Sequence, residues 1–375
     1  MEGLTCMKCK QTSSIPPSAQ HIRCFGCGSV YSVGHSNDND DAHVMVNYKG
    51  TTECSLDFTK KKAEAKLICH SLRRKLPFST QASPPLAINI SMTEQPRRGR
   101  RAFLCGVTYR KQKHQLKGTA HDVNNIRDLL LQRYHFPKES ILTLAEEESY
   151  NPPTKKNIED GFKWLIRGIQ PGDSLVFYFS GHGKRQREFN GDERDGFDET
   201  ICPVDFETSG MILDNDINEA IVRPLIQDVK LHAIIDSCHS GTVLDLPQVY
   251  DITTGKWEDN SPPSGAYKGT KGGTAICFSA CEDYQLAADT SAFSPEKEMT
   301  GAMTITFILA VKAALDKNES ITYQDIMDSM HQTIKQASKS GGFFAGIRRF
   351  FHRRILQDPV LSSSEEFNTN TEFKL

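Results

Sequence analysis

Two short apolar runs, each closed by a polar block that contains glycine, dominate the pattern of hydrophobic and polar positions in this chain. The runs cover residues 175–179 and 231–235, and aliphatic or aromatic side chains fill them apart from His232. Apolar runs of this length, bounded by turn-forming residues, predict strands that are buried on both faces, as strands of a parallel sheet are.

Strand-like and helix-like patterns alternate over the remainder of the chain after residue 100. Further strands are predicted at residues 101–109 and 274–280, and apolar residues three or four apart predict helices at 122–134, 157–169, 218–225 and 303–315. Such alternation predicts an α/β fold with a mostly parallel central sheet flanked by helices.

Polar residues able to carry out catalysis follow directly after both apolar runs. His182 lies in the block 180–183 and Cys238 in the block 236–241. In an open α/β sheet, ligands bind beyond the carboxyl ends of the strands, and a cysteine and a histidine brought there can act as nucleophile and base. We therefore expect a cysteine hydrolase in which His182 activates the Cys238 thiol, whose ordinary pKa is about 8.5.

Two other residues compete for these roles. Cys281 also follows a predicted strand, but no histidine lies near it in the sequence, so we interpret it as structural. His239 directly follows Cys238, and we expect its side chain to point away from the thiol. A buried, purely structural Cys238 is the remaining alternative, and it leaves the polar neighbours of this residue unexplained.

Six short blocks occur in order between roughly residues 101 and 367. They are YFSGHG at 178–183, DERDGFDE at 192–199, PVD at 203–205, GMILD at 210–214, DSCHSG at 236–241 and FSAC at 278–281. Together they resemble the caspase-like cysteine peptidases and, more narrowly, the plant type I metacaspases. The resemblance implies a caspase-like sandwich fold and a catalytic dyad of His182 and Cys238. It also implies that the backbone N–H groups of Gly183 and Cys238 stabilise the oxyanion.

The same resemblance implies specificity for Arg or Lys before the scissile bond. The substrate pocket of the family corresponds to Asp122, Ser180 and Asp236. Two carboxylates facing a guanidinium form charge-assisted hydrogen bonds, which favours this assignment. Taken alone, Asp122 could equally be an acidic residue that stabilises the first turn of a helix.

Acidic residues are concentrated after His182 and suggest calcium, a hard cation that accepts several oxygen ligands from irregular loops. By resemblance, the low-affinity calcium site of the family corresponds to Asp198, Asp214, Asn215 and Asp245, with Asn215 at a position often held by aspartate. The twelve-residue loop of an EF-hand is missing. A solvated acidic loop without an ion is the alternative.

Two Cys-x-x-Cys pairs near the N-terminus, with fourteen residues between them, predict a structural zinc site. The expected ligands are Cys6, Cys9, Cys24 and Cys27. The pattern resembles the zinc ribbon of plant cell-death regulators, whose usual role is protein interaction. Unrelated thiols in a disordered leader are the alternative.

The predicted organisation has five parts. They are a zinc ribbon at 1–33, a flexible linker or prodomain at 34–98, a large-subunit catalytic region at 99–250, a processing loop at 251–273 and a small-subunit region at 274–375. Loops of this polar kind are natural sites of proteolytic cleavage. Lys256, Lys268 and Lys271 are the predicted points of self-processing, as expected of a zymogen cut by a basic-specific enzyme.

Composition narrows the partners. The formal net charge is −2, so no overall positive field attracts nucleic acid, and no run approaches the roughly 18 apolar residues of a membrane span. No apolar leader follows Met1, so the eleven cysteines are not expected to form structural disulfides. These features favour the cytoplasm, with the nucleus as a second location, and the family resemblance implies a monomer.

The predicted function is that of a calcium-stimulated cysteine endopeptidase acting on peptides and proteins after Arg or Lys, in programmed cell death or in stress or immune regulation. The alternative is a weakly active or inactive scaffold that binds signalling partners through its zinc ribbon. A zinc-dependent nucleic-acid binder is disfavoured, because no basic, aromatic face accompanies the cysteine pairs.

Overall fold

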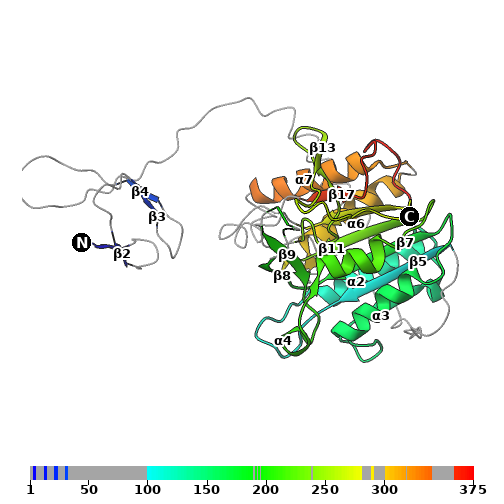
Figure 1. Cartoon of the computed structure of the whole chain (residues 1–375), viewed down its shortest axis with the longest axis horizontal. Coiled ribbons are helices and arrows are strands. Elements are labelled where there is room, and N and C mark those ends of the chain that lie inside the picture. The colour runs from blue at the N-terminus through cyan, green and yellow to red at the C-terminus, as the bar shows by residue number, and fades with distance from the viewer. Residues whose placement is uncertain are drawn as a thin grey trace, which may run out of the picture. The chain divides into compact units, whose positions relative to one another are not determined.

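A computed structural model describes most of the chain after residue 98 and short strands before it (Figure 1). The described residues are 3–5, 12–14, 21–23, 30–32, 99–188, 191, 193–194, 196–237, 240–280, 289–290, 300–317, 319–339 and 359–375. Residue contacts divide the chain into two units, Met1–Ser83 and Pro84–Leu375.

The first unit contains two antiparallel strand pairs. β1 (Gly3–Thr5) pairs with β2 (Thr12–Ser14), and β3 (His21–Arg23) pairs with β4 (Val30–Ser32). The four cysteines predicted to bind zinc fall in the sequence between the strands of these two pairs. All four lie outside the described residues, so the zinc site stays a prediction.

The second unit is built on an eight-stranded sheet with the order β13-β12-β17-β14-β11-β7-β5-β6. Five neighbouring strands are parallel, and three at one edge are antiparallel. The strands are β5 (Arg100–Gly106), β6 (Ile141–Leu144), β7 (Ser174–Ser180), β11 (Lys230–Asp236), β12 (Gln248–Asp251), β13 (Lys256–Asp259), β14 (Thr274–Ser279) and β17 (Val360–Ser363). The predicted α/β fold with a mostly parallel sheet is confirmed.

Helices cover both faces of this sheet because its central strands carry apolar side chains on both faces. In β5, Phe103 packs on one side with α3 (Lys155–Ile166), whereas Leu104 packs on the other side with α2 (Thr119–Gln132) and α6 (Ala302–Leu315). α7 (Tyr323–Lys339) adds to the second layer. Successive side chains of a strand point to opposite faces, so a continuous apolar run requires cover on both.

A smaller three-stranded sheet continues from the end of β7. It consists of β8 (Gly183–Arg187), β9 (Phe197–Ile201) and β10 (Ile212–Leu213), all antiparallel. The remaining short elements are η1 (Lys138–Ser140), α4 (Phe206–Ser209), α5 (Asp214–Ile217), η2 (Asn218–Val222), β15 (Asp289–Thr290) and β16 (Thr300–Gly301). β8 and β9 carry residues of the predicted catalytic and calcium sites.

Two predicted segments differ in detail from the structure. The helix expected at 218–225 begins earlier, at α5, and continues as the π-type turn η2. The polar stretch that begins at residue 251 contains β13, which pairs with β12 in a hairpin whose turn is held by Asp251 accepting from the N–H and hydroxyl of Thr253. Trp257 of β13 packs against Tyr250, which explains why this polar strand joins the sheet.

No helix in the described part of the chain has the length and apolar character that crossing a bilayer requires.

Candidate active site and acidic cluster

The carboxyl ends of β5, β7 and β11 meet at one edge of the sheet. Ser180, the last residue of β7, is in register with Gly106 of β5 on one side and with Asp236 of β11 on the other. The N–H of Gly181 also donates to the carbonyl of Asp236, at 3.2 Å. His182 therefore emerges beside the segment that carries Cys238, two residues beyond Asp236. Cys238 itself lies outside the described residues, as do His239 and Cys281.

The His182 side chain is held in one orientation by a backbone carbonyl. Its Nε2 atom lies 2.6 Å from the carbonyl oxygen of His114, which can only accept a hydrogen bond. Nε2 is therefore the protonated nitrogen, and in the neutral ring Nδ1 carries the lone pair. A histidine with this tautomer is prepared to accept a proton at Nδ1.

The Tyr109 hydroxyl holds the backbone of His182 in place. Its hydroxyl accepts from the N–H of His182 at 2.9 Å and donates to the carbonyl of Cys202 at 2.5 Å. The ring centroids of Tyr109 and His182 lie 4.7 Å apart, and Tyr109 is fully buried. Burial raises the pKa of Tyr109 well above its ordinary value, so the hydroxyl stays protonated and keeps both bonds. Sequence reasoning missed this residue, which it placed at the end of a strand with no polar role.

The predicted substrate-pocket residues come together around the start of α6. Asp122, in the first turn of α2, accepts from the Ser180 hydroxyl at 3.2 Å and from the N–H of Gly301 at 3.0 Å. Asp236 accepts from the N–H and the hydroxyl of Thr304, at 2.7 and 2.6 Å. Both carboxylates are at least 95% buried, with exposed fractions of 1% and 5%.

The Asp236 carboxylate supplies the hydrogen-bond acceptor that the N-terminus of α6 lacks. Gly301, the N-cap residue of α6, has no side chain to accept from the first turn, and Asp236 accepts from Thr304 in its place. A carboxylate at this position also interacts favourably with the positive end of the helix dipole. The roles of Gly301 and Thr304 could not be predicted from sequence, because both residues lie far from Asp236 along the chain.

A second group of carboxylates lies between β9 and α5. Glu193, Asp198 and Asp214 each place one carboxylate oxygen within 4.8 Å of the other two. Burial is the larger cause and repulsion from neighbouring carboxylates the smaller, and together they raise the pKa of Glu193 and of Asp214 to about 8. A bound cation would offset both costs, and converging carboxylate oxygens are the donors that Ca²⁺ prefers. The sequence-based ligand set did not include Glu193.

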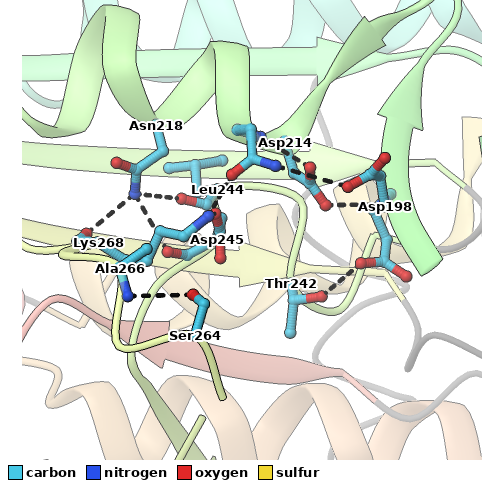
Figure 2. Close-up of polar contacts among 11 residues, drawn as sticks. Asp198, Asp214, Asn218, Thr242, Leu244, Asp245, Ser264, Ala266 and Lys268 are labelled. Carbon is cyan, nitrogen blue, oxygen red and sulfur yellow. Dashed lines mark hydrogen bonds and ion pairs between the residues drawn. The ribbon is translucent and has the colours of Figure 1, made fainter. Parts of the chain in front are cut away.

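The other two predicted calcium ligands, Asn215 and Asp245, already contact a positively charged side chain of the protein. Figure 2 labels Asp245 and this lysine, Lys268. The Lys268 ammonium donates to Asn215 Oδ1 and to Asp245 Oδ2. Asn215 also contacts the other carboxylates, since its Nδ2 atom lies 3.5 Å from Asp198 Oδ1. The structure thus brings all four predicted ligands into one neighbourhood. We call these four residues and Glu193 the acidic cluster. The Lys268 ammonium contacts two of its members.

The three predicted processing lysines differ in exposure. Lys256, on β13, and Lys271 are exposed, whereas Lys268 is 7% exposed. Cleavage after Lys268 therefore requires the lysine to leave the acidic cluster first. Gly183, a predicted oxyanion donor, begins β8 and lies opposite Ile201 of β9.

Sequence comparisons agree with a cysteine peptidase built on this fold. A model of the metacaspase peptidase C14 domain matches residues 100–247. Metacaspase-1 of Arabidopsis thaliana is 50% identical over 251 residues, covering 66% of this chain and 67% of the relative. Metacaspase-3 is 44% identical, covering 72% and 73%, and Metacaspase-2 is 46% identical, covering 63% and 57%, both from the same plant. The chain belongs to the metacaspase family and is a cysteine-type peptidase.

Proposed function

We propose that this protein is a calcium-stimulated endopeptidase that cleaves peptide bonds after Arg or Lys, using Cys238 and His182. The observation that carries the proposal is the pair of buried carboxylates, Asp122 and Asp236, at the sheet edge from which His182 emerges. Asp122 accepts from the Ser180 hydroxyl and the N–H of Gly301, and Asp236 accepts from the N–H and hydroxyl of Thr304. A cationic substrate side chain would add a charge-assisted hydrogen bond to each carboxylate.

Catalysis would begin with proton transfer from the Cys238 thiol to Nδ1 of His182. The thiolate then attacks the scissile carbonyl, and the N–H groups of Gly183 and Cys238 stabilise the oxyanion. His182 returns the proton to the leaving amine as the thioester forms, and water, deprotonated by the same imidazole, hydrolyses the thioester. The carbonyl of His114 keeps the imidazole in the required tautomer throughout and stabilises the imidazolium.

Specificity would follow from charge and geometry at Asp122 and Asp236. A guanidinium presents five N–H donors in a plane, and an ammonium presents three. Both groups bind a carboxylate more strongly than they bind a neutral hydroxyl such as that of Ser180. An Asp substrate would bring a third negative charge into a buried site that has two, which costs several kcal/mol in a poorly solvated environment.

The roles of metals and the cellular role are also proposals. Convergence of Glu193, Asp198 and Asp214 supports calcium binding at the acidic cluster. The Cys-x-x-Cys spacing supports zinc held by Cys6, Cys9, Cys24 and Cys27, and a protein-interaction role for that unit. Membership of the metacaspase family supports a cytoplasmic or nuclear regulator of cell death or stress responses, converted from a zymogen by self-cleavage.

The test is hydrolysis of matched fluorogenic peptides that end in Arg, Lys or Asp, with and without millimolar calcium. Cys238→Ala should abolish turnover, and Asp236→Asn should lower kcat/KM for the Arg peptide by at least about 100-fold, because it removes one buried charge and keeps the acceptor for Thr304. Asp128→Asn, on the exposed side of α2, is the matched control and should leave kcat/KM unchanged. Cleavage after Asp would refute the pocket, and no cleavage by folded protein would favour the scaffold.

A further inference from the structure

Lys268 occupies a position that an activating metal ion would be expected to contest. Its ammonium donates to Asn215 and to Asp245, and the Lys268 and Asp245 side chains are each 6% exposed. A buried ammonium is costly unless acidic partners surround it. The acidic cluster supplies that surrounding, so Lys268 neutralises part of the charge that would otherwise attract a divalent cation.

The backbone around Lys268 is fastened to the same region. We call residues 264–273 the strap. The side-chain amide of Asn218 donates to the carbonyl of Lys268 at 3.0 Å and to the carbonyls of Leu244 and Asp245 at 3.0 and 3.1 Å (Figure 2). One buried amide therefore holds the strap against the segment that carries Asp245.

Each end of the strap is anchored to a different neighbour. At its start, the N–H of Ser264 donates to the carbonyl of Gly191, in the acidic loop that also contains Glu193. At its end, the N–H groups of Lys271 and Gly273 donate to the carbonyl of Leu225, at 2.9 and 3.1 Å. Between these anchors, Lys268 is the strap residue whose charged side chain enters the acidic cluster.

We propose that Lys268 is a tethered cation that competes with calcium for the acidic cluster, so that calcium binding expels Lys268 and releases the strap. The proposal rests on the calcium site proposed above. A divalent ion bound by Glu193, Asp198 and Asp214 repels the nearby ammonium, and it offers Asn215 and Asp245 a stronger partner.

Release of the strap would also change the order of self-processing. Lys271 and Lys256 are exposed, whereas the Lys268 side chain is unavailable to any substrate pocket while it is buried. Expulsion by calcium makes the bond after Lys268 available to a peptidase that cleaves after Lys. Calcium then acts on the substrate strap as well as on the enzyme.

Calcium binding to the full-length chain carrying Cys238→Ala, which prevents self-cleavage, tests the competition by titration calorimetry. Lys268→Gln should raise calcium affinity at least tenfold, because it removes the competing charge and leaves every carboxylate in place. Lys271→Gln removes an exposed lysine from the same strap and should match the parent. Equal affinities in all three proteins would overturn the proposal while supporting the calcium site. Absence of calcium binding in all three would overturn both.

A second measurement uses the unaltered lysine, in case Lys268→Gln fails to fold. The Cys238→Ala chain is digested briefly with a lysine-specific endoproteinase, and mass spectrometry follows cleavage after Lys268 and after Lys271 with calcium or with a chelator. Calcium should accelerate cleavage after Lys268 at least tenfold relative to cleavage after Lys271. An unchanged ratio at a calcium concentration that saturates binding would overturn strap release.

Discussion

Replacing Gly301 with alanine should disturb the proposed substrate pocket through one added carbon atom. An ideal Cβ at this position would lie 2.0 Å from Asp236 Oδ2, 2.5 Å from its Cγ and 2.8 Å from its Oδ1. The backbone itself tolerates alanine, since φ is −68° and ψ is 136°. The cost therefore comes from contact with the Asp236 carboxylate and not from backbone strain.

The magnitude follows from the hydrogen bonds that must stretch. Reaching even a tight 3.0 Å contact from 2.0 Å requires a shift of about 1 Å, which would lengthen the bonds from Thr304, now 2.7 and 2.6 Å, toward about 3.6 Å. Each bond to a charged acceptor contributes about 1.5–3 kcal/mol. After partial relaxation and the smaller entropy of the unfolded alanine chain, we expect a net loss of about 2–4 kcal/mol.

Two assays separate folding from specificity. Thermal or denaturant unfolding should show the loss of stability, and kcat/KM for the Arg peptide should fall roughly 100-fold, since a misplacement of about 1 Å in a substrate-positioning group can cost that much. Thr304→Val is the comparison, because it removes the hydroxyl bonds of Thr304 to Asp236 and to Tyr178 but adds no atom against the Asp236 carboxylate, and it should have the smaller effect on kcat/KM. Unchanged stability and unchanged kcat/KM in Gly301→Ala would refute the packing argument.

Two further predictions concern buried polar side chains. Tyr109→Phe should lower kcat about tenfold with little change in KM and reduce stability by about 1–3 kcal/mol, because it leaves the N–H of His182 without its hydroxyl partner; enzyme kinetics and thermal unfolding check both effects. Burial lowers the pKa of His232 from 6.5 to about 3, so the folded state binds fewer protons than the unfolded state between these values, and stability falls as pH decreases through that window. Denaturant unfolding at pH 4 to 7 should show a shallower pH dependence for His232→Leu, by up to about 1.4 kcal/mol per pH unit.

The sheet was predictable because strands buried on both faces appear in the sequence as continuous apolar runs. Runs such as 175–179 are apolar at every position, and this pattern arises only when helices cover both faces of a strand. The parallel order brings the ends of β7 and β11 together, as the sequence predicted. The pairing of His182 with Cys238 stays a prediction, because Cys238 lies outside the described residues. β13 was missed because only Trp257 among its four residues is apolar, and its neighbours in the fold decide its structure.

The supporting residues of the site were less predictable because their roles depend on contacts between distant segments. Asp236 and Thr304 are 68 positions apart, and nothing near either residue in the sequence indicates that one caps the helix of the other. The same holds for Tyr109, whose hydroxyl bonds to His182 from 73 positions away. Polar residues that follow strands can be recognised from pattern, whereas the groups that satisfy them are set by tertiary packing.

The two acidic sites differ in how the protein compensates their charge, and this difference has consequences for binding. Asp122 and Asp236 accept from hydroxyl and backbone N–H groups, and an ionised carboxylate has sites for about four hydrogen bonds, so a cationic substrate side chain can be added beside these donors. Asp245 instead faces the full positive charge of Lys268, which a second cation must displace. Substrate binding is therefore expected to need no rearrangement of the pocket donors, whereas calcium binding is expected to be weakened by the cost of expelling a lysine. That cost gives calcium a means of moving the strap, because an ion that displaced nothing could not shift its position.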